Sequence, residues 1–201
     1  NISSDGGRIM RTKENWLTDA VHELENEFKS ENLIMPAKWR ISSGFPSKGG
    51  LAAKKRTIGQ CFDPRASKDG TTEIIISITQ DEELKILGII AHEMIHATGI
   101  MDHGPKFKKI ANAIGLEGKM TATEEGELFI TRTISILKTL GDFPHAALDH
   151  TIGRKKQTTR MIKVECSDDS CGMVFRTSNK WVVEADNNFD CPICAAPAYS
   201  K

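Results

Sequence analysis

The sequence lacks the features that would direct a protein to a membrane. No apolar run among its 201 residues is long enough to span a bilayer, no charged and then apolar leader opens it, and its formal net charge is zero. These absences predict a cytoplasmic protein without a membrane partner. With 39% hydrophobic residues, the chain can build one sizeable core and a small appendage, but not two large domains.

Cysteine is scarce except near the C-terminus, where four of the five cysteines form two pairs. Cys166 and Cys171 are separated by four residues, Cys191 and Cys194 by two, and the pairs by nineteen. This spacing predicts a four-thiolate structural zinc site. Two disulfides are the alternative, but they would require an oxidising compartment and an export signal. The fifth cysteine, Cys61, is expected to be a buried strand residue.

The segment between the cysteine pairs contains two alternating patterns, at residues 173–177 and 180–184, which predict short strands. A fold of about forty residues buries too little apolar surface to be stable alone, and a closed metal site would supply the missing stability. We therefore predict a zinc ribbon at residues 164–201. A basic linker at residues 151–163 would join it to a main domain at residues 1–150.

Hydrophobic periodicity divides the main domain into helices and strands. The pattern predicts helices at residues 12–30, 82–98, 105–114 and 123–140, and strands at residues 38–42, 56–62 and 72–78. Strands first and helices later indicate an α+β fold with helices on one side of an antiparallel or mixed sheet. The stretch at residues 141–159 lacks periodicity, so we expect the linker to begin there.

The helix predicted at residues 82–98 contains the sequence His92-Glu93-Met94-Ile95-His96. Two histidines one turn apart on one helix face supply two of the four ligands that zinc prefers. Glu93 would lie beside the metal, take a proton from a zinc-bound water whose pKa has fallen to about 7, and return it to a leaving amine. The motif therefore predicts a metallopeptidase with Glu93 as its general base.

The third metal ligand has three candidates. Gly99 predicts a chain reversal after the helix, which would bring His103 back toward the metal. The metzincin pattern H-E-x-x-H-x-x-G-x-x-H instead places Asp102 at the last ligand position. A glutamate farther along, Glu124 or Glu125, is the third candidate. We favour His103 because imidazole is the commoner zinc ligand.

The motif and the run His103-Gly104-Pro105-Lys106-Phe107 at the start of a second helix resemble the SprT-like metallopeptidases, including the short forms of phages and bacteria. The similarity continues through residues 114–123 and the four-cysteine module, and it covers residues 10–200 in all. Its most specific parts are residues 85–125 and 161–194.

The resemblance implies a zincin-like body in which His92, His96 and His103 bind zinc and Glu93 is the catalytic base. Together with the four-cysteine site, it predicts two zinc ions per chain, one catalytic and one structural. A protein or peptide would be the substrate, and for a phage-encoded chain the location would be the host cytoplasm. Some members of the family cleave proteins attached to DNA, so DNA is an expected partner by analogy.

A cluster of cations directly before the ribbon supports the same partner. Residues 154–163 contain no acid, and their cations include Arg154, Lys155, Lys156 and Arg160. Clustered cations attract phosphate through counterion release. A solvated linker explains the cluster equally well, because residues 164–201 carry three cations against six acids. The competing function is a nucleic-acid-binding zinc ribbon attached to a catalytically idle SprT-like scaffold.

Substrate binding is the part of the function that the sequence defines least. A peptide held against a sheet edge needs an exposed strand next to the motif helix, and residues 72–79 are the candidate. That strand could equally be buried, because residues 74–76 are apolar on both faces. The only tyrosine, Tyr199, lies in the ribbon. The oxyanion of the reaction must then be stabilised by zinc or by a residue that the sequence does not identify.

Overall fold

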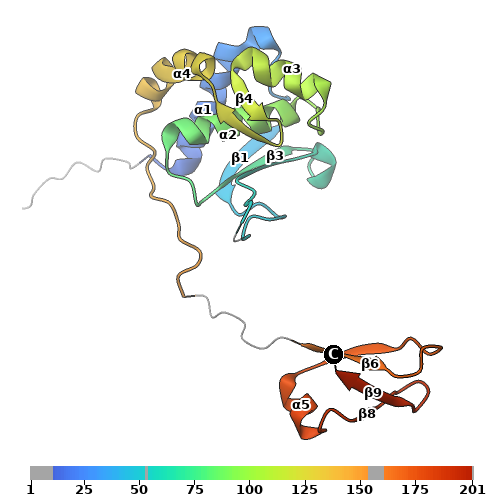
Figure 1. Cartoon of the computed structure of the whole chain (residues 1–201). Helices are drawn as coiled ribbons and strands as arrows, with labels where there is room; N and C mark the ends of the chain where they lie inside the picture. The colour runs from blue at the N-terminus through green and yellow to red at the C-terminus, as the bar shows by residue number, and fades with distance from the viewer. Residues whose placement is uncertain (1–10, 53, 154–160, 201) are drawn as a thin grey trace, which may run out of the picture. The chain divides into compact units, whose positions relative to one another are not determined.

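The computed structural model describes residues 11–52, 54–153 and 161–200. The chain forms two compact units, Asn1–His150 and Thr151–Lys201 (Figure 1). The four basic residues proposed to contact DNA, Arg154, Lys155, Lys156 and Arg160, lie outside the described residues. Within the described part of the chain, no helix combines the length and the apolar character needed to cross a membrane.

The first unit opens with helix α1 (Lys13–Phe28), as the apolar stripe predicts. It begins where the Thr12 side chain accepts a hydrogen bond from the backbone N–H of Asn15 at 3.1 Å, which satisfies one free donor of the first turn. The short 3-10 helix η1 (Lys29–Glu31) follows it, and Asn32 ends that helix in the left-handed region, with φ 66°. The buried face of α1 carries Trp16, Leu17, Ala20, Val21, Leu24 and Phe28.

Three strands form a mixed sheet: β1 (Trp39–Gly44), β2 (Gly59–Phe62) and β3 (Thr72–Ser77). Their order is β1-β3-β2, with β1 parallel and β2 antiparallel to β3. The predicted mixed sheet is confirmed, and Figure 1 shows the helices on one face of it. Of the two interpretations of residues 72–79, the buried strand is confirmed and the exposed edge is wrong, because β3 is paired on both sides. Among the described strands, β2 has the unpaired edge next to the motif helix.

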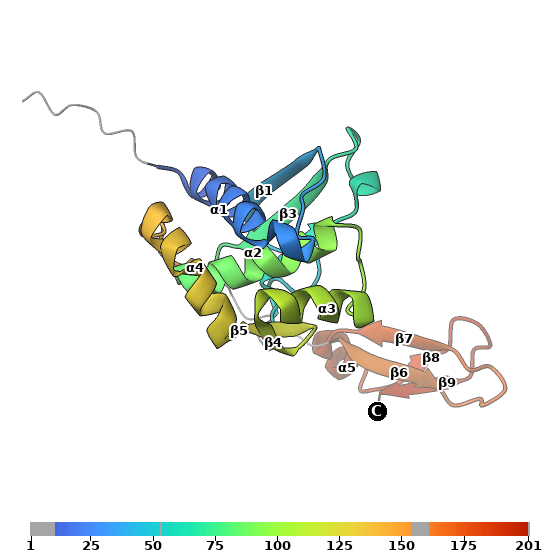
Figure 2. The ribbon, with the colours of Figure 1, turned by 90° about the horizontal axis from the view of Figure 1, so that it is seen from above.

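Helix α2 (Glu83–Ala97) carries the histidine motif and is the central helix of the first unit. Eleven of its fifteen residues are buried. It contacts α1, α3, α4, β2, β3 and β5. Figure 2 shows α2 between the sheet and α1 on one side and α3 with the hairpin β4–β5 on the other. A helix that is apolar on nearly all faces is stable only in such an interior position.

Helix α3 (Pro105–Ile114) has the predicted bounds, with proline at its first position and Gly115 after its last. Gly115 has φ +89°, and a Cβ there would lie 2.4 Å from the backbone nitrogen of Phe129. No larger residue fits this turn without a shift of the chain.

The segment after α3 forms an unpredicted hairpin, β4 (Leu116–Lys119) and β5 (Ala122–Glu125). The helix predicted from residue 123 is wrong at its start, because α4 spans Glu127–Leu140. Residues 122–125 pair with β4 instead, and Gly126 occupies the position before the helix. Strands of four residues are too short to give a clear alternating pattern.

The expected linker starts too early at residue 141, because the segment up to residue 150 is bound to the first unit. Phe143 packs edge-on against Trp16, with ring centroids 5.2 Å apart. Its backbone N–H donates to the Glu83 carboxylate at 2.9 Å, and the N–H of Leu148 donates to the Ile78 carbonyl at 2.9 Å. Such long-range backbone contacts leave no trace in hydrophobic periodicity.

The described residues of the second unit form four short strands and one helix: β6 (Ile162–Cys166), β7 (Val174–Thr177), α5 (Asn179–Glu184), β8 (Phe189–Asp190) and β9 (Pro197–Ser200). The sheet is antiparallel, in the order β7-β6-β9-β8. Two predictions are wrong here. Residues 162 and 163 belong to β6 and not to the linker, and residues 180–184 are helical.

Local hydrogen bonding explains the helix α5. The backbone N–H groups of Trp181 and Val182 both donate to the Ser178 carbonyl, which closes a helical turn that an alternating pattern does not reveal. Asp186 and Asn187 follow the helix with φ 47° and 56°, in the left-handed region. The turn therefore reverses the chain toward β8.

Candidate metal centres

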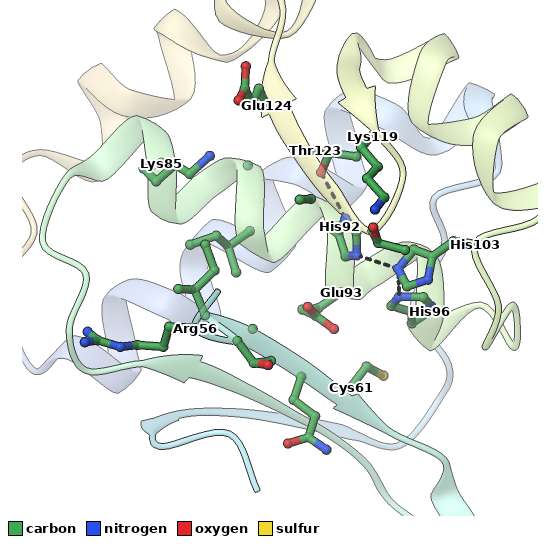
Figure 3. Close-up of a pocket in the computed structure, with 18 of the residues that line it drawn as sticks. Arg56, Cys61, Lys85, His92, Glu93, His96, His103, Lys119, Thr123 and Glu124 are labelled. Carbon is green, nitrogen blue, oxygen red and sulfur yellow. Dashed lines mark hydrogen bonds between the residues drawn. The ribbon is translucent and has the colours of Figure 1, made fainter. Parts of the chain in front are cut away.

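Three histidines of the first unit converge on one point (Figure 3). Helix α2 presents His92 and His96 one turn apart. The chain then reverses at Gly99, which has φ +96°, and brings His103 back toward the pair. The Nε2 atom of His103 lies 3.1 Å from Nε2 of His92 and 3.2 Å from Nε2 of His96. The cluster could hold a metal ion.

The distances and the hydrogen bonds of this cluster fit a metal ion of zinc size. Tetrahedral nitrogen ligands at about 2.0–2.1 Å from zinc lie about 3.3–3.4 Å from one another. The Nδ1 atom of His96 donates to the Ile100 carbonyl at 2.7 Å. Because a carbonyl only accepts, the ring proton of His96 is on Nδ1, and the lone pair of Nε2 faces the cluster. The Nδ1 atom of His92 lies 2.9 Å from Thr123 Oγ1, a hydroxyl that can donate or accept, and its Nε2 likewise faces the cluster.

Burial keeps the imidazoles neutral, which is the form that binds metals. It lowers the pKa of His92 to about 3, with further lowering by the neighbouring His96 and His103. It also lowers the pKa of His96 and of His103, and at His96 the hydrogen bond to Ile100 acts in the opposite direction. His96 is buried and His92 and His103 are partly buried, and each neutral imidazole has one ring nitrogen whose lone pair can bind a metal ion.

The other candidates for a third ligand do not join the cluster. Asp102 accepts a hydrogen bond from the backbone N–H of Gly104 at 2.7 Å. Glu125 forms an ion pair with Lys85 at 3.1 Å. Glu124 extends away from the histidines in Figure 3. Among the described residues, His103 is the one that the fold brings to the pair.

Glu93 lies beside the histidines with its side chain between α2 and β2 (Figure 3). It is buried, with 6% of its surface exposed. Burial raises the pKa of its carboxyl group to about 8, while a hydrogen bond from the backbone N–H of Cys61 lowers it. The carboxylate is therefore held by β2 and faces the site at which a reaction could occur.

Gly59 of β2 makes room for this carboxylate. A Cβ at residue 59 would lie 2.5 Å from Oε1 of Glu93 and 2.6 Å from Cγ2 of Ile89. Sequence reasoning did not identify Gly59, although a glycine within a strand is a known sign of close approach. Cys61, expected to be buried, is only half-buried, and its partial burial raises the pKa of the thiol to about 12.

The histidines and Glu93 open onto a cavity of about 740 Å³. One wall is β2 with the residues before it, the other is the hairpin β4–β5, and α2 lies between them (Figure 3). The cations that line the cavity are Lys55, Arg56, Lys85 and Lys119. A cavity of this size lies within the range of about 300–1,000 Å³ that is typical of ligand-binding sites.

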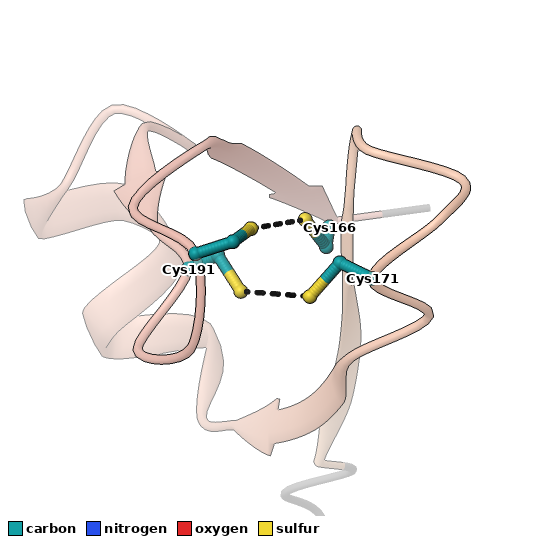
Figure 4. A group of neighbouring side chains, drawn as sticks. Cys166, Cys171 and Cys191 are labelled. Carbon is teal, nitrogen blue, oxygen red and sulfur yellow. Dashed lines mark hydrogen bonds between the residues drawn. The ribbon is translucent and has the colours of Figure 1, made fainter.

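The second unit gathers four cysteine sulfurs within 4.8 Å of one another (Figure 4). The Sγ atoms of Cys166 and Cys194 are 3.5 Å apart, and those of Cys171 and Cys191 are 3.7 Å apart. A disulfide would require about 2.0 Å, so the alternative of two disulfides is wrong for this structure. Thiolates around one zinc ion lie about 3.7–3.8 Å apart, which fits the observed separations.

The backbone around these cysteines supports metal binding. The N–H groups of Cys194 and Ile193 lower the pKa of Cys191 to about 7, which favours its thiolate. The N–H of Asp168 donates to Sγ of Cys166 at 3.4 Å and lowers its pKa, but burial and the neighbouring thiols raise that pKa to about 12. Donors placed around a group of four sulfurs stabilise the negative charge that a metal-binding thiolate carries.

Comparisons of the chain with family models, with curated proteins and with solved structures give no match.

Proposed function

We propose that this protein is a zinc-dependent metallopeptidase of the SprT-like type. His92, His96 and His103 would hold the catalytic zinc, and Glu93 would act as the general base. One observation carries the proposal: three imidazole Nε2 atoms converge beside a buried carboxylate at the base of an open cavity. A purely structural zinc site commonly has four protein ligands, whereas a catalytic one has three and an open position.

The difference between the two clusters supports two zinc ions with different roles. The four cysteines form a closed set of thiolates in a unit whose buried hydrophobic residues are only Val164, Cys191 and Ala198 among those described. A unit with so small a core gains stability from a metal. The three histidines instead belong to a unit with a large core of its own. Metal there is not required for folding and is available for chemistry.

The positions of Glu93 and the three histidines suggest how a peptide bond would be hydrolysed. Zinc, when bound, would polarise a carbonyl and lower the pKa of water to about 7. Glu93 accepts a proton from the attacking water as the water oxygen bonds to the carbonyl carbon. The C–N bond then breaks, and Glu93 gives the proton to the leaving nitrogen. Burial favours this exchange because it raises the affinity of the carboxylate for a proton.

The substrate would be a peptide segment in extended conformation. Strand β2 lines the cavity and pairs only with β3 among the described strands, so its other edge offers backbone groups to a peptide. The edge replaces the one expected at residues 72–79. Because backbone groups are common to all peptides, this mode of binding supports cleavage of unfolded segments of many sequences.

Removal and return of zinc test this function. The full-length protein should cleave an unfolded protein such as casein, and a weak chelator should abolish cleavage while about one zinc per chain remains bound to the thiolates. Added zinc should restore the activity. Activity that survives complete loss of the histidine-bound metal would contradict the proposal.

A second role, binding of nucleic acid, is favoured by the exposed aromatic side chains of the second unit. Trp181 is 54% exposed and Tyr199 46% exposed, and Lys180 lies over the Trp181 ring at 4.9 Å. Exposed aromatic residues stack on bases of single strands. Replacing Trp181 with alanine should weaken binding to single-stranded DNA without loss of zinc, whereas unchanged affinity would contradict this role.

A further inference from the structure

The proposed reaction places negative charge on the carbonyl oxygen of the substrate as water adds to the carbon. Enzymes that hydrolyse amides aim preorganised donors at this oxygen. Tyrosine cannot serve in the first unit, because the only tyrosine of the chain, Tyr199, belongs to the second. Within the first unit, a donor that acts beside zinc would come from another residue that lines the cavity.

The cations of the cavity differ in how they are bound. Lys85 is held in an ion pair with Glu125 at 3.1 Å. The Nε atom of Arg56 donates to the carbonyl of Ala52 at 3.3 Å. Like Lys55, Lys119 has no ion-pair partner within the part of the chain that the structure describes. Its ammonium group is therefore available to a ligand.

The direction of the Lys119 side chain points to the reacting site. In Figure 3 it extends from the hairpin toward His92 and His103, whereas Arg56 and Lys85 lie on the opposite side of the cavity. A lysine ammonium has three donors and no acceptor, so an oxygen that becomes anionic is its natural partner.

The hairpin fixes the backbone of Lys119 relative to the histidines. Lys119 pairs with Ala122, and the next pair along the hairpin is Gly118 with Thr123. The Oγ1 atom of Thr123 lies 2.9 Å from Nδ1 of His92. The base of the hairpin is closed by the N–H of Gly126, which donates to the carbonyl of Gly115 at 3.0 Å. These contacts fix the backbone from which the exposed Lys119 side chain extends, so its ammonium group starts from a set position beside His92.

We propose that Lys119 is a catalytic residue that donates a hydrogen bond and a positive charge to the carbonyl oxygen of the scissile peptide bond. The proposal rests on the proposed peptidase function. It assigns to the hairpin β4–β5 a part in the chemistry, beyond its contact with His92. It also explains how a first unit without tyrosine stabilises the oxyanion.

Kinetics of Lys119→Met and Lys119→Arg in the full-length protein test the assignment. Methionine keeps the length of the side chain and removes its charge, so kcat should fall at least about tenfold with KM and zinc content unchanged. Arginine should restore part of the loss. The matched control is Lys108→Met, which removes an exposed lysine of α3 outside the cavity and should leave kcat at the wild-type value.

Binding of a transition-state mimic gives a second readout that does not depend on turnover. A tripeptide phosphinate carries anionic oxygens in place of the scissile carbonyl, and titration calorimetry with the zinc-loaded protein should show an affinity at least about tenfold lower for Lys119→Met than for the wild type. If the wild type cleaves the substrate and Lys119→Met has the same kcat and the same phosphinate affinity as the wild type, the role assigned to Lys119 is wrong. The proposed peptidase function would not be affected by that result. Absence of cleavage by the wild type would overturn the peptidase function, and this assignment with it.

Discussion

Replacement of Gly59 with alanine is a sharp test of how the fold positions the general base. The new Cβ would lie 2.5 Å from Oε1 of Glu93, which is about 0.9 Å closer than the 3.4 Å at which ordinary contact begins. It would also lie 2.6 Å from Cγ2 of Ile89, a buried residue of α2 that has little freedom to move. Glu93 must therefore shift by about 1 Å.

A shift of that size has a predictable effect on rate. Displacement of a catalytic group by 1 Å costs about 100-fold, so we expect Gly59→Ala to lower kcat by about two orders of magnitude with zinc content unchanged. Overpacking should also lower the free energy of unfolding by about 1–3 kcal/mol. Steady-state kinetics with casein, zinc analysis and urea unfolding measure the three quantities.

Gly44→Ala provides the matched control. Gly44 also lies in a strand, β1, and a Cβ there would make only an ordinary contact of 3.4 Å with Ile75. This variant should keep wild-type kcat. If Gly59→Ala kept kcat within about twofold of the wild type, the claim that β2 and α2 together position Glu93 would be refuted.

Three further predictions concern the metal sites. His103→Ala should remove one zinc per chain and abolish cleavage, whereas Asp102→Ala should keep both the zinc and the cleavage. If metal analysis showed zinc loss in Asp102→Ala and not in His103→Ala, Asp102 would be the ligand, as in the metzincin pattern. Thr123→Val should weaken zinc binding at the histidines by about 10- to 100-fold, because it removes the partner of His92 Nδ1, and competition with a zinc dye measures this. Joint replacement of Cys166 and Cys191 with serine should remove the other zinc and unfold only the second unit, and amide exchange that also lost protection in the first unit would contradict this independence.

The sequence predicted well those elements whose ends carry local signals. Thr12 and Pro105 mark the starts of α1 and α3, and Gly115 marks the end of α3. The position of His92 and His96 on one helix face follows directly from helical spacing. The four-cysteine cluster could likewise be predicted from spacing, because short loops between paired cysteines leave few ways to arrange four sulfurs.

The sequence did not predict features that depend on contacts between distant segments. The hairpin β4–β5 has strands too short for a periodic signal, yet it supplies Thr123 to the histidine cluster and Lys119 to the cavity. Gly59 has meaning only once β2 lies against Glu93. The central position of β3 depends on sheet order, which an apolar run such as residues 74–76 leaves open.

The most direct test of the central claim compares Glu93→Gln with the wild-type protein. Glutamine keeps the size of the side chain but cannot take up a proton, so this variant should bind the same two zinc ions per chain and lose at least about 100-fold in casein cleavage. Both proteins should be prepared with the metal restored, and their zinc content should be measured on the samples used for kinetics. A wild type that cleaves casein and a zinc-replete Glu93→Gln that cleaves it equally fast would contradict the account.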